Sequence, residues 1–274
     1  SPRTSSVASA LVKAGESASL SLPGSWLRGG ERLSLSVDRS PVLSVLPSLQ
    51  FLVEYPYGCL EQTVSRAWPY LVLGEIQKAL HPDKDESGNT NKILAETVSR
   101  VCSMMTSQGG FGLWPGYNTP DPWRSVNATF FLVEAKDRVS VAPSVLESSL
   151  NYLNLLMALP VESYYSKPYA YSTKAFAAFV LTRAGRAPLG WLQTLSAHEK
   201  DMYPSGRIFL AGAKALVAGN ADALKALDDA KLKLGEKDAL GLNMSLESNL
   251  RNRSLLLYFW SLVAPADART TPLC

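Results

Sequence analysis

The sequence predicts a mainly α-helical fold of the α/α-toroid type, α6/α6-like, in which outer helices wrap an inner ring, with a short β segment at the N-terminus. Two observations predict it. From about residue 42 onward, apolar residues recur at three- and four-residue spacing. Several of these segments are also apolar on most of their circumference, so the helices need partners on two sides. An α/α toroid supplies that environment better than a four-helix bundle.

The N-terminal segment, residues 1–41, has a different pattern. Apolar and polar residues alternate over Ser19–Leu22 and Arg32–Asp38, on either side of a turn region at Gly24–Gly30. This alternation predicts two strands. Because two strands alone are marginally stable, we expect the segment to belong to a β-domain whose other strands lie elsewhere.

The rest of the chain, residues 42–274, is predicted to contain about ten helices separated by glycine and proline. They are expected over Val42–Glu54, Leu60–Leu80, Asn91–Ser107, Pro122–Arg138, Pro143–Leu159, Ser172–Ala184, Leu189–Ala197, Arg207–Ala218, Asp222–Leu234 and Leu246–Val263. The glycine-rich run Gln108–Pro115 fits a turn between toroid helices, where glycines let the backbone pass close to its neighbours and aromatic side chains fill the barrel.

Composition excludes several classes of function. The hydrophobic fraction of 46% predicts a folded core, and the net charge of +3 comes from 27 basic and 24 acidic residues without a dense basic cluster. A nucleic acid partner is therefore not expected. The longest apolar run, Ser254–Ala264, is about half of what a bilayer requires, so this domain itself should make no membrane contact. Three cysteines and two histidines, irregularly spaced, predict neither a disulfide framework nor a metal site, and we expect no cofactor.

The stretch Tyr55–Thr63 (Tyr-Pro-Tyr-Gly-Cys-Leu-Glu-Gln-Thr) carries the chemistry. Its proline and glycine predict a turn, which places Cys59 at a helix N-terminus, where backbone N–H groups and the dipole favour a thiolate. Gln62 lies three residues on, so its Cβ should be roughly 5–6 Å from that of Cys59. Attack of the sulfur on the amide carbon, with loss of ammonia, would leave an internal thioester. Glu61 is a candidate proton donor to the ammonia, or simply an acid favoured in a first helical turn.

The run Gly58–Gln62 resembles the Gly-Cys-x-Glu-Gln thioester motif of the alpha-2-macroglobulin and complement family, and its longer Tyr-Pro-Tyr-Gly-Cys-Leu-Glu-Gln form is similar to the bacterial branch. Gly109–Pro115, followed by a helix that opens at Trp123, is similar to a second signature of these domains. Ala175–Gly185 resembles a third. Together the three signatures cover about residues 42–263.

This resemblance implies that residues 42–274 form the thioester domain of a bacterial alpha-2-macroglobulin, a protease inhibitor and not an enzyme. Residues 1–41 would then be strands of the preceding CUB-like domain. In such a protein a protease cuts a bait segment, and the exposed thioester acylates a lysine amine of the attacker. The implied partners are target proteases and the other domains of the parent protein. The implied location is the periplasm, where the parent protein can be an anchored lipoprotein.

The bond needs apolar cover to escape hydrolysis. The aromatic residues expected to shield it are Tyr55, Tyr57, Trp114, Trp123, Tyr164 and Tyr165. The alternative is that these rings only fill the toroid.

Two features depart from the family pattern. Complement components that prefer hydroxyl targets have a histidine in the loop that corresponds to Pro160–Tyr169, and this loop contains none. A primary amine should therefore be the preferred nucleophile. No closing helix follows Val263, so either the toroid closes unusually or the chain is a fragment that lacks its last helices, and we favour the fragment.

Other functions remain open from the residues alone. Cys59 and Cys102 could be inert core cysteines, the reading preferred for Cys102 beside its two methionines. The chain could be an interaction module without a functional thioester. A toroid-fold cyclase would need an acidic motif, but Asp228–Asp229 is expected on a solvated helix face. A glycosidase would need two opposed carboxylates, which Glu54, Glu61 and Asp121 could supply at a separation that the sequence does not give. A Cys59 pair with His81 or His198 has no matching context.

Overall fold

The computed structural model describes residues 58–80, 87–218 and 248–265, with residues 8, 10, 12, 15–21, 35, 37, 225, 227 and 228. By its contacts the chain divides into two units, Ser1–Ser48 and Leu49–Cys274. The second unit contains α2 (Leu60–Leu80), α3 (Ser87–Cys102), α4 (Pro122–Ala135), α5 (Pro143–Ala158), η2 (Val161–Ser163), α6 (Lys167–Arg183), α7 (Leu189–Ala197), η3 (Glu199–Asp201), α8 (Pro204–Ala218) and α10 (Asn249–Val263).

The predicted α-helical class is confirmed for the part of the chain that the structure describes. The predicted bounds of Leu60–Leu80 and Leu189–Ala197 match those of α2 and α7. The helix predicted over Val42–Glu54 lies outside the described residues, as does nearly all of the one over Asp222–Leu234. The β segment predicted over residues 1–41 lies almost wholly outside them too, so the predicted domain boundary stays a prediction.

Several predicted helix boundaries differ from the structure by a few residues, and two of these differences have an identifiable reason. The helix expected over Asn91–Ser107 ends at Cys102, because the chain then turns and Met105 pairs with Phe111 in an antiparallel bridge. The helix expected from Ser172 begins at Lys167, because the hydroxyl of Ser166 accepts a hydrogen bond from the N–H of Tyr169 and caps it. Apolar periodicity misses such polar first turns.

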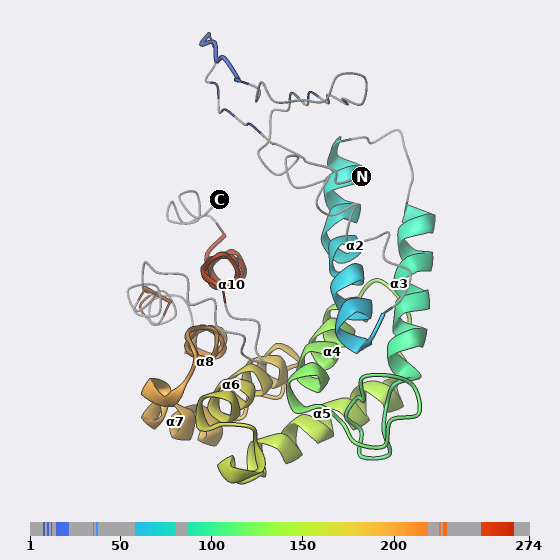
Figure 1. Cartoon of the computed structure of the whole chain (residues 1–274), viewed down its shortest axis with the longest axis vertical. Coiled ribbons are helices and arrows are strands. Elements are labelled where there is room, and N and C mark those ends of the chain that lie inside the picture. The colour runs from blue at the N-terminus through green and yellow to red at the C-terminus, as the bar shows by residue number, and fades with distance from the viewer. Residues whose placement is uncertain are drawn as a thin grey trace, which may run out of the picture. The chain divides into compact units, whose positions relative to one another are not determined.

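Helix α4 separates two hydrophobic clusters. Val126, Phe130 and Val133 pack into one cluster, whereas Phe131 and Leu132 pack into the other, and all five are buried. These positions lie on opposite faces of one helix, which explains why α4 is apolar nearly all round. Figure 1 shows α2 and α3 side by side with α4 next to them, and α6 packs on α4, α5, α7 and α8.

The larger cluster surrounds α6 and is rich in aromatic rings. Phe176 and Phe209 stack with centroids 4.0 Å apart, and Phe179 meets Phe259 edge-on at 4.8 Å. These rings join α6, α8 and α10. Gly206 allows the close approach of α8 to α6, because a Cβ there would lie 2.8 Å from Cα of Ser172. The smaller cluster is built by α2, α3, α4 and the loop before α4.

Trp68 joins α2 to α4. Its ring lies 4.7 Å from that of Phe130 and 6.1 Å from that of Phe131, so it contacts both faces of the dividing helix. Aromatic pairs at such distances contribute about 0.5–1.5 kcal/mol beyond their area burial. Trp68 thereby packs α2 on α4 about two helical turns from the starts of the two helices, where the polar residues of the candidate site lie.

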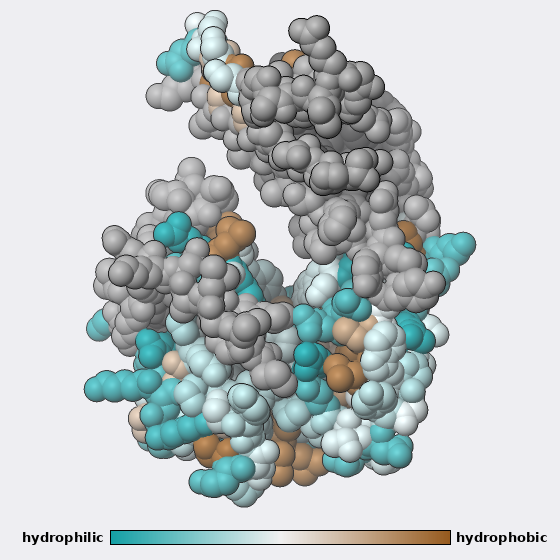
Figure 2. All heavy atoms as spheres, in the orientation of Figure 1, coloured by the Kyte–Doolittle hydropathy of each residue, from teal (hydrophilic) through white to brown (hydrophobic). Residues whose placement is uncertain are grey.

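Apart from the polar residues at the starts of α2 and α4, the described residues offer few features that suggest a function. Figure 2 shows that their apolar side chains form small separate patches on the visible face. None of the described helices is both long and apolar enough to cross a membrane. Among those same residues, no group of three His, Cys, Asp or Glu side chains could hold a metal ion.

Candidate functional site at the start of helix α2

Cys59 caps the N-terminus of α2. Its carbonyl accepts the N–H of Thr63 at 2.9 Å, and its own N–H donates to Oε1 of Gln62 at 3.1 Å. This is half of the capping-box arrangement, with a cysteine where serine or threonine usually stands. The side chain of Gln62 therefore folds back over the first turn, and its amide carbon lies beside Cys59. The predicted proximity of the two residues agrees with this geometry.

The glycine-rich loop before α4 satisfies the next backbone donor of α2. The carbonyl of Leu113 accepts the N–H of Leu60 at 3.0 Å, and the side chain of Leu60 is fully buried in the smaller cluster. The first helical turn leaves several N–H groups without helical partners. Gln62 and Leu113 together satisfy two such donors around the motif, and Leu60 anchors the motif in the core.

The same loop is clamped onto α4 through Phe111. Its N–H donates to Oγ of Ser125 at 2.8 Å, and its carbonyl accepts from Ser125 at 3.2 Å and from the N–H of Asp121 at 2.9 Å. Gly110 brings the loop against α5, since a Cβ there would lie 2.6 Å from the ring of Tyr152. The expectation that glycines let this loop pass close to its neighbours is confirmed.

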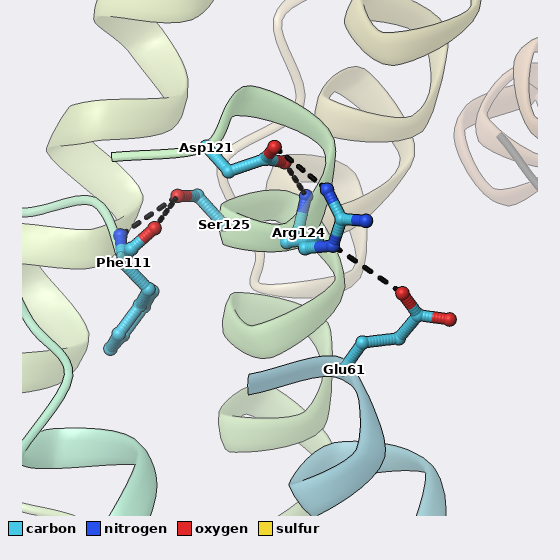
Figure 3. A network of polar contacts seen from close by, with 5 residues as sticks. All are labelled: Glu61, Phe111, Asp121, Arg124 and Ser125. Atoms are coloured by element: carbon cyan, nitrogen blue, oxygen red, sulfur yellow. Dashed lines mark hydrogen bonds and ion pairs between the residues drawn. The ribbon is translucent and has the colours of Figure 1, made fainter. Parts of the chain in front are cut away.

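A charged bridge links the first turns of α2 and α4 (Figure 3). Nε of Arg124 donates to Glu61 at 3.3 Å, and Nη1 donates to Asp121 at 2.8 Å. Oδ1 of Asp121 also accepts the N–H of Arg124 at 2.9 Å, which caps α4. Burial disfavours the charged guanidinium, but the charges and hydrogen bonds of Asp121 and Glu61 outweigh it and raise the pKa of Arg124.

The aromatic residues predicted to shield the motif have different environments. Trp114 follows Leu113 on the loop and is 40% exposed, whereas Trp123, next to Arg124, is buried against Phe176 at 5.8 Å. Tyr164 is buried in the larger cluster and donates to the carbonyl of Leu156 at 2.7 Å. Tyr165 is 82% exposed. Tyr55 and Tyr57 lie outside the described residues. A shielding role for all six stays a prediction.

The other cysteine and histidine among the described residues have ordinary environments. Cys102 is partly buried against the smaller cluster, and burial raises the pKa of its thiol, as expected of a core residue. His198 stacks on Tyr171 at 4.4 Å, and its Nδ1 lies 3.2 Å from Asp201.

The sequence reasoning missed Arg124 and Ser125. Ser125 carries no signal that a sequence alone would reveal. Arg124 carries a weak one, because a cation in the first turn of a helix is opposed by the helix dipole.

The family model and the known proteins that match this chain belong to the same family. Residues 36–158 match the model of the A-macroglobulin TED domain. An alpha-2-macroglobulin homolog of Yersinia pestis is 30% identical over 211 residues, which is 73% of this chain and 10% of that protein. Alpha-2-macroglobulin of Escherichia coli is 32% identical over 177 residues, 61% of this chain and 10% of that protein. The chain thus spans about a tenth of the length of these relatives.

Solved structures give the same fold. Native alpha-2-macroglobulin of Escherichia coli, from domain MG7 to the C-terminus, superposes with a TM-score of 0.73 at 24% identity, over 84% of this chain and 37% of that one. Salmonella alpha-2-macroglobulin reacted with methylamine gives 0.71 at 24% identity, over 84% and 15%. Escherichia coli alpha-2-macroglobulin activated by porcine elastase gives 0.70 at 26% identity, over 80% and 20%.

Proposed function

Because this chain belongs to the alpha-2-macroglobulin family through its TED domain, we propose that Cys59 and Gln62 form an internal thioester that captures proteases through their lysine amines. The hydrogen bond from the N–H of Cys59 to Oε1 of Gln62 carries the proposal. It turns the amide of Gln62 back toward the residue that bears the sulfur, on the first turn of a helix whose dipole favours negative charge there.

The chemistry follows from this geometry. The thiolate of Cys59 adds to the amide carbon of Gln62, and the negative charge develops on Oε1, the atom that already accepts the Cys59 N–H. Expulsion of ammonia, once protonated, leaves the thioester. Later an amine adds to the same carbon, and the Cys59 thiolate departs, leaving a substituted amide at Gln62. A donor placed at the developing charge lowers the barrier of both steps.

Glu61 retains its proposed role as proton donor to the departing ammonia: its carboxylate would take the proton that the Cys59 thiol gives up and pass it to the amide nitrogen. It also has a structural partner. Its carboxylate is one residue from Gln62 and is paired with Arg124. The two roles predict different results when the partner is removed, which makes them separable.

An amine target is supported by the loop between α5 and α6. This loop contains no histidine that could take up the acyl group and pass it to a hydroxyl. It is held in place by Lys174, whose Nζ donates to the carbonyl of Leu159 at 2.6 Å and lies 5.7 Å from the ring centroid of Tyr164. Burial lowers the pKa of Lys174, although the charge of Glu162 opposes that shift.

Capture of a lysine needs more than chemistry. A lysine with its ordinary pKa of about 10.4 is neutral in only about one molecule in a thousand at pH 7. Transfer therefore depends on holding the attacker close enough to gain a large effective molarity. Proteases as the targets are supported by the structures of Escherichia coli alpha-2-macroglobulin activated by porcine elastase and by trypsin. Cooperation with further domains of the parent protein and a periplasmic location belong to the same proposal.

Methylamine labelling tests the proposal. Native protein should take up methylamine at Gln62 and release one titratable thiol at Cys59, because an amine opens the thioester to an amide and a thiolate. Cys59→Ala should abolish both. Labelling that persists in Cys59→Ala would contradict the proposal, since it would mean that the amine reacts elsewhere.

A further inference from the structure

Arg124 occupies a position that helix physics disfavours. It lies in the first turn of α4, where a positive charge costs about 0.3–1 kcal/mol against the helix dipole. Two carboxylates compensate this cost. Asp121 comes from the start of the same helix, and Glu61 comes from the first turn of α2, 63 residues away in the sequence. One of the two carboxylates that pair with the Arg124 guanidinium therefore belongs to the thioester motif.

The bridge closes a ring of contacts around the motif. One route runs from α2 to the loop, through the N–H of Leu60 and the carbonyl of Leu113. The loop reaches α4 through the hydrogen bonds that Phe111 makes with Asp121 and Ser125. The second route returns from α4 to α2 through Arg124 and Glu61 (Figure 3). The two routes end on Leu60 and Glu61, the two residues that lie between Cys59 and Gln62.

We propose that Arg124 is a positioning residue for the thioester, which acts through Glu61 to hold the first turn of α2 in the geometry that brings Cys59 and Gln62 together. The proposal rests on the proposed function. In this proposal Glu61 anchors the first turn of α2 to α4. An arginine suits this position because its Nε and Nη1 bind two carboxylates at once, which a single ammonium cannot do with the same geometry.

The expected effect is chemical as well as structural. The thioester closes a strained ring within one helical turn, so its formation and survival depend on how narrowly the two side chains are confined. Without the bridge, the first turn of α2 keeps its link to Leu113 but loses the lateral restraint on Glu61. We expect thioester formation to slow and hydrolysis to accelerate, each by roughly tenfold.

The test compares Arg124→Gln and Arg124→Lys with Arg183→Gln in the full chain. Arg183 pairs with Glu134 in the last turn of α4 at 2.8 Å, about 15 Å along the helix from Arg124. Its loss destabilises the same helix without touching the motif. Intact mass gives the fraction of chains lacking one ammonia, its decay at fixed pH gives the hydrolysis rate, and thermal unfolding reports the fold.

Arg124→Gln should lose the thioester about tenfold faster than the unmutated chain, Arg124→Lys should be intermediate, and Arg183→Gln should hydrolyse at the unmutated rate despite a lower unfolding midpoint. Equal hydrolysis in all variants, or an unmutated rate in Arg124→Lys, would overturn the bridging role. Equally fast loss of the thioester in the Arg124 and Arg183 variants would also overturn the bridging role.

A double-mutant cycle with Glu61→Gln separates anchor from proton donor. If Glu61 acts through Arg124, the two single variants and the double variant should form the thioester at similarly reduced rates. If removing Glu61 slows formation just as much in the Arg124→Gln background as in the unmutated one, Glu61 acts alone and the inference fails while the proposed function stands. An unmutated chain with neither the mass deficit nor methylamine uptake would overturn both.

Discussion

The backbone N–H of Cys59 donates a hydrogen bond to Oε1 of Gln62 across 3.1 Å. This N–H group satisfies the cap of α2, and in the proposed reaction it would also face the oxygen that becomes negative when a nucleophile adds to the Gln62 carbon. Folding alone needs only an acceptor at residue 62. The reaction needs an amide whose nitrogen can leave as ammonia.

Gln62→Glu should separate these needs. A carboxylate also accepts the Cys59 N–H, and a negative charge is favoured in a first helical turn. We expect the free energies of unfolding of Gln62→Glu and of Cys59→Ala, which also lacks the thioester, to differ by less than about 0.5 kcal/mol. The variant should show no ammonia-sized mass deficit and no methylamine uptake. A thioester in Gln62→Glu would contradict the assignment of Gln62 as the acyl donor.

The proximity of the two residues in this turn could be predicted from the sequence, whereas the surroundings of the turn could not. Cys59 and Gln62 are local to one helical turn, so a spacing of three residues suffices to place them together. The partner of Glu61 could not be predicted, because Arg124 is 63 residues away and only the packing of α2 on α4 joins them. The cap at Ser166 was missed because a helix start shows in polar chemistry and not in apolar periodicity.

Nucleophile choice should follow the missing histidine. We expect methylamine to label the unmutated chain much more than glycerol does. Tyr165→His should raise both glycerol labelling and hydrolysis, because it introduces an imidazole into the loop at a side chain that is 82% exposed. Tyr164 is a poorer choice, since its hydroxyl bonds to the carbonyl of Leu156 in the core. Comparable labelling of the unmutated chain by glycerol and methylamine would contradict the argument.

Stability should fall at alkaline pH. Burial, with smaller contributions from nearby charges, raises the pKa values of Tyr152, Tyr169 and Tyr258 to about 12. These phenols stay protonated in the folded state while the unfolded chain ionises above pH 10, so their stabilising contribution is complete below pH 10 and is lost as pH rises toward 12. Urea unfolding of Cys59→Ala between pH 8 and 12 measures this without thioester hydrolysis.

Tyr152→Phe, made in the same background, provides the control for that pH dependence. Tyr152 is the tyrosine that contacts the glycine-rich loop, and its replacement removes one ionising group without removing the ring. The fall in stability between pH 10 and 12 should become shallower. An unchanged slope would show that Tyr152 does not contribute to the alkaline transition.

The most direct test of the central claim is the intact mass of freshly prepared, unmutated protein. A thioester between Cys59 and Gln62 predicts a chain lighter by one ammonia than the free Cys/Gln form, and self-cleavage before Gln62 on denaturation wherever the bond survives. A mass equal to that of the free Cys/Gln form in fresh protein, without such cleavage or methylamine uptake, would contradict the account.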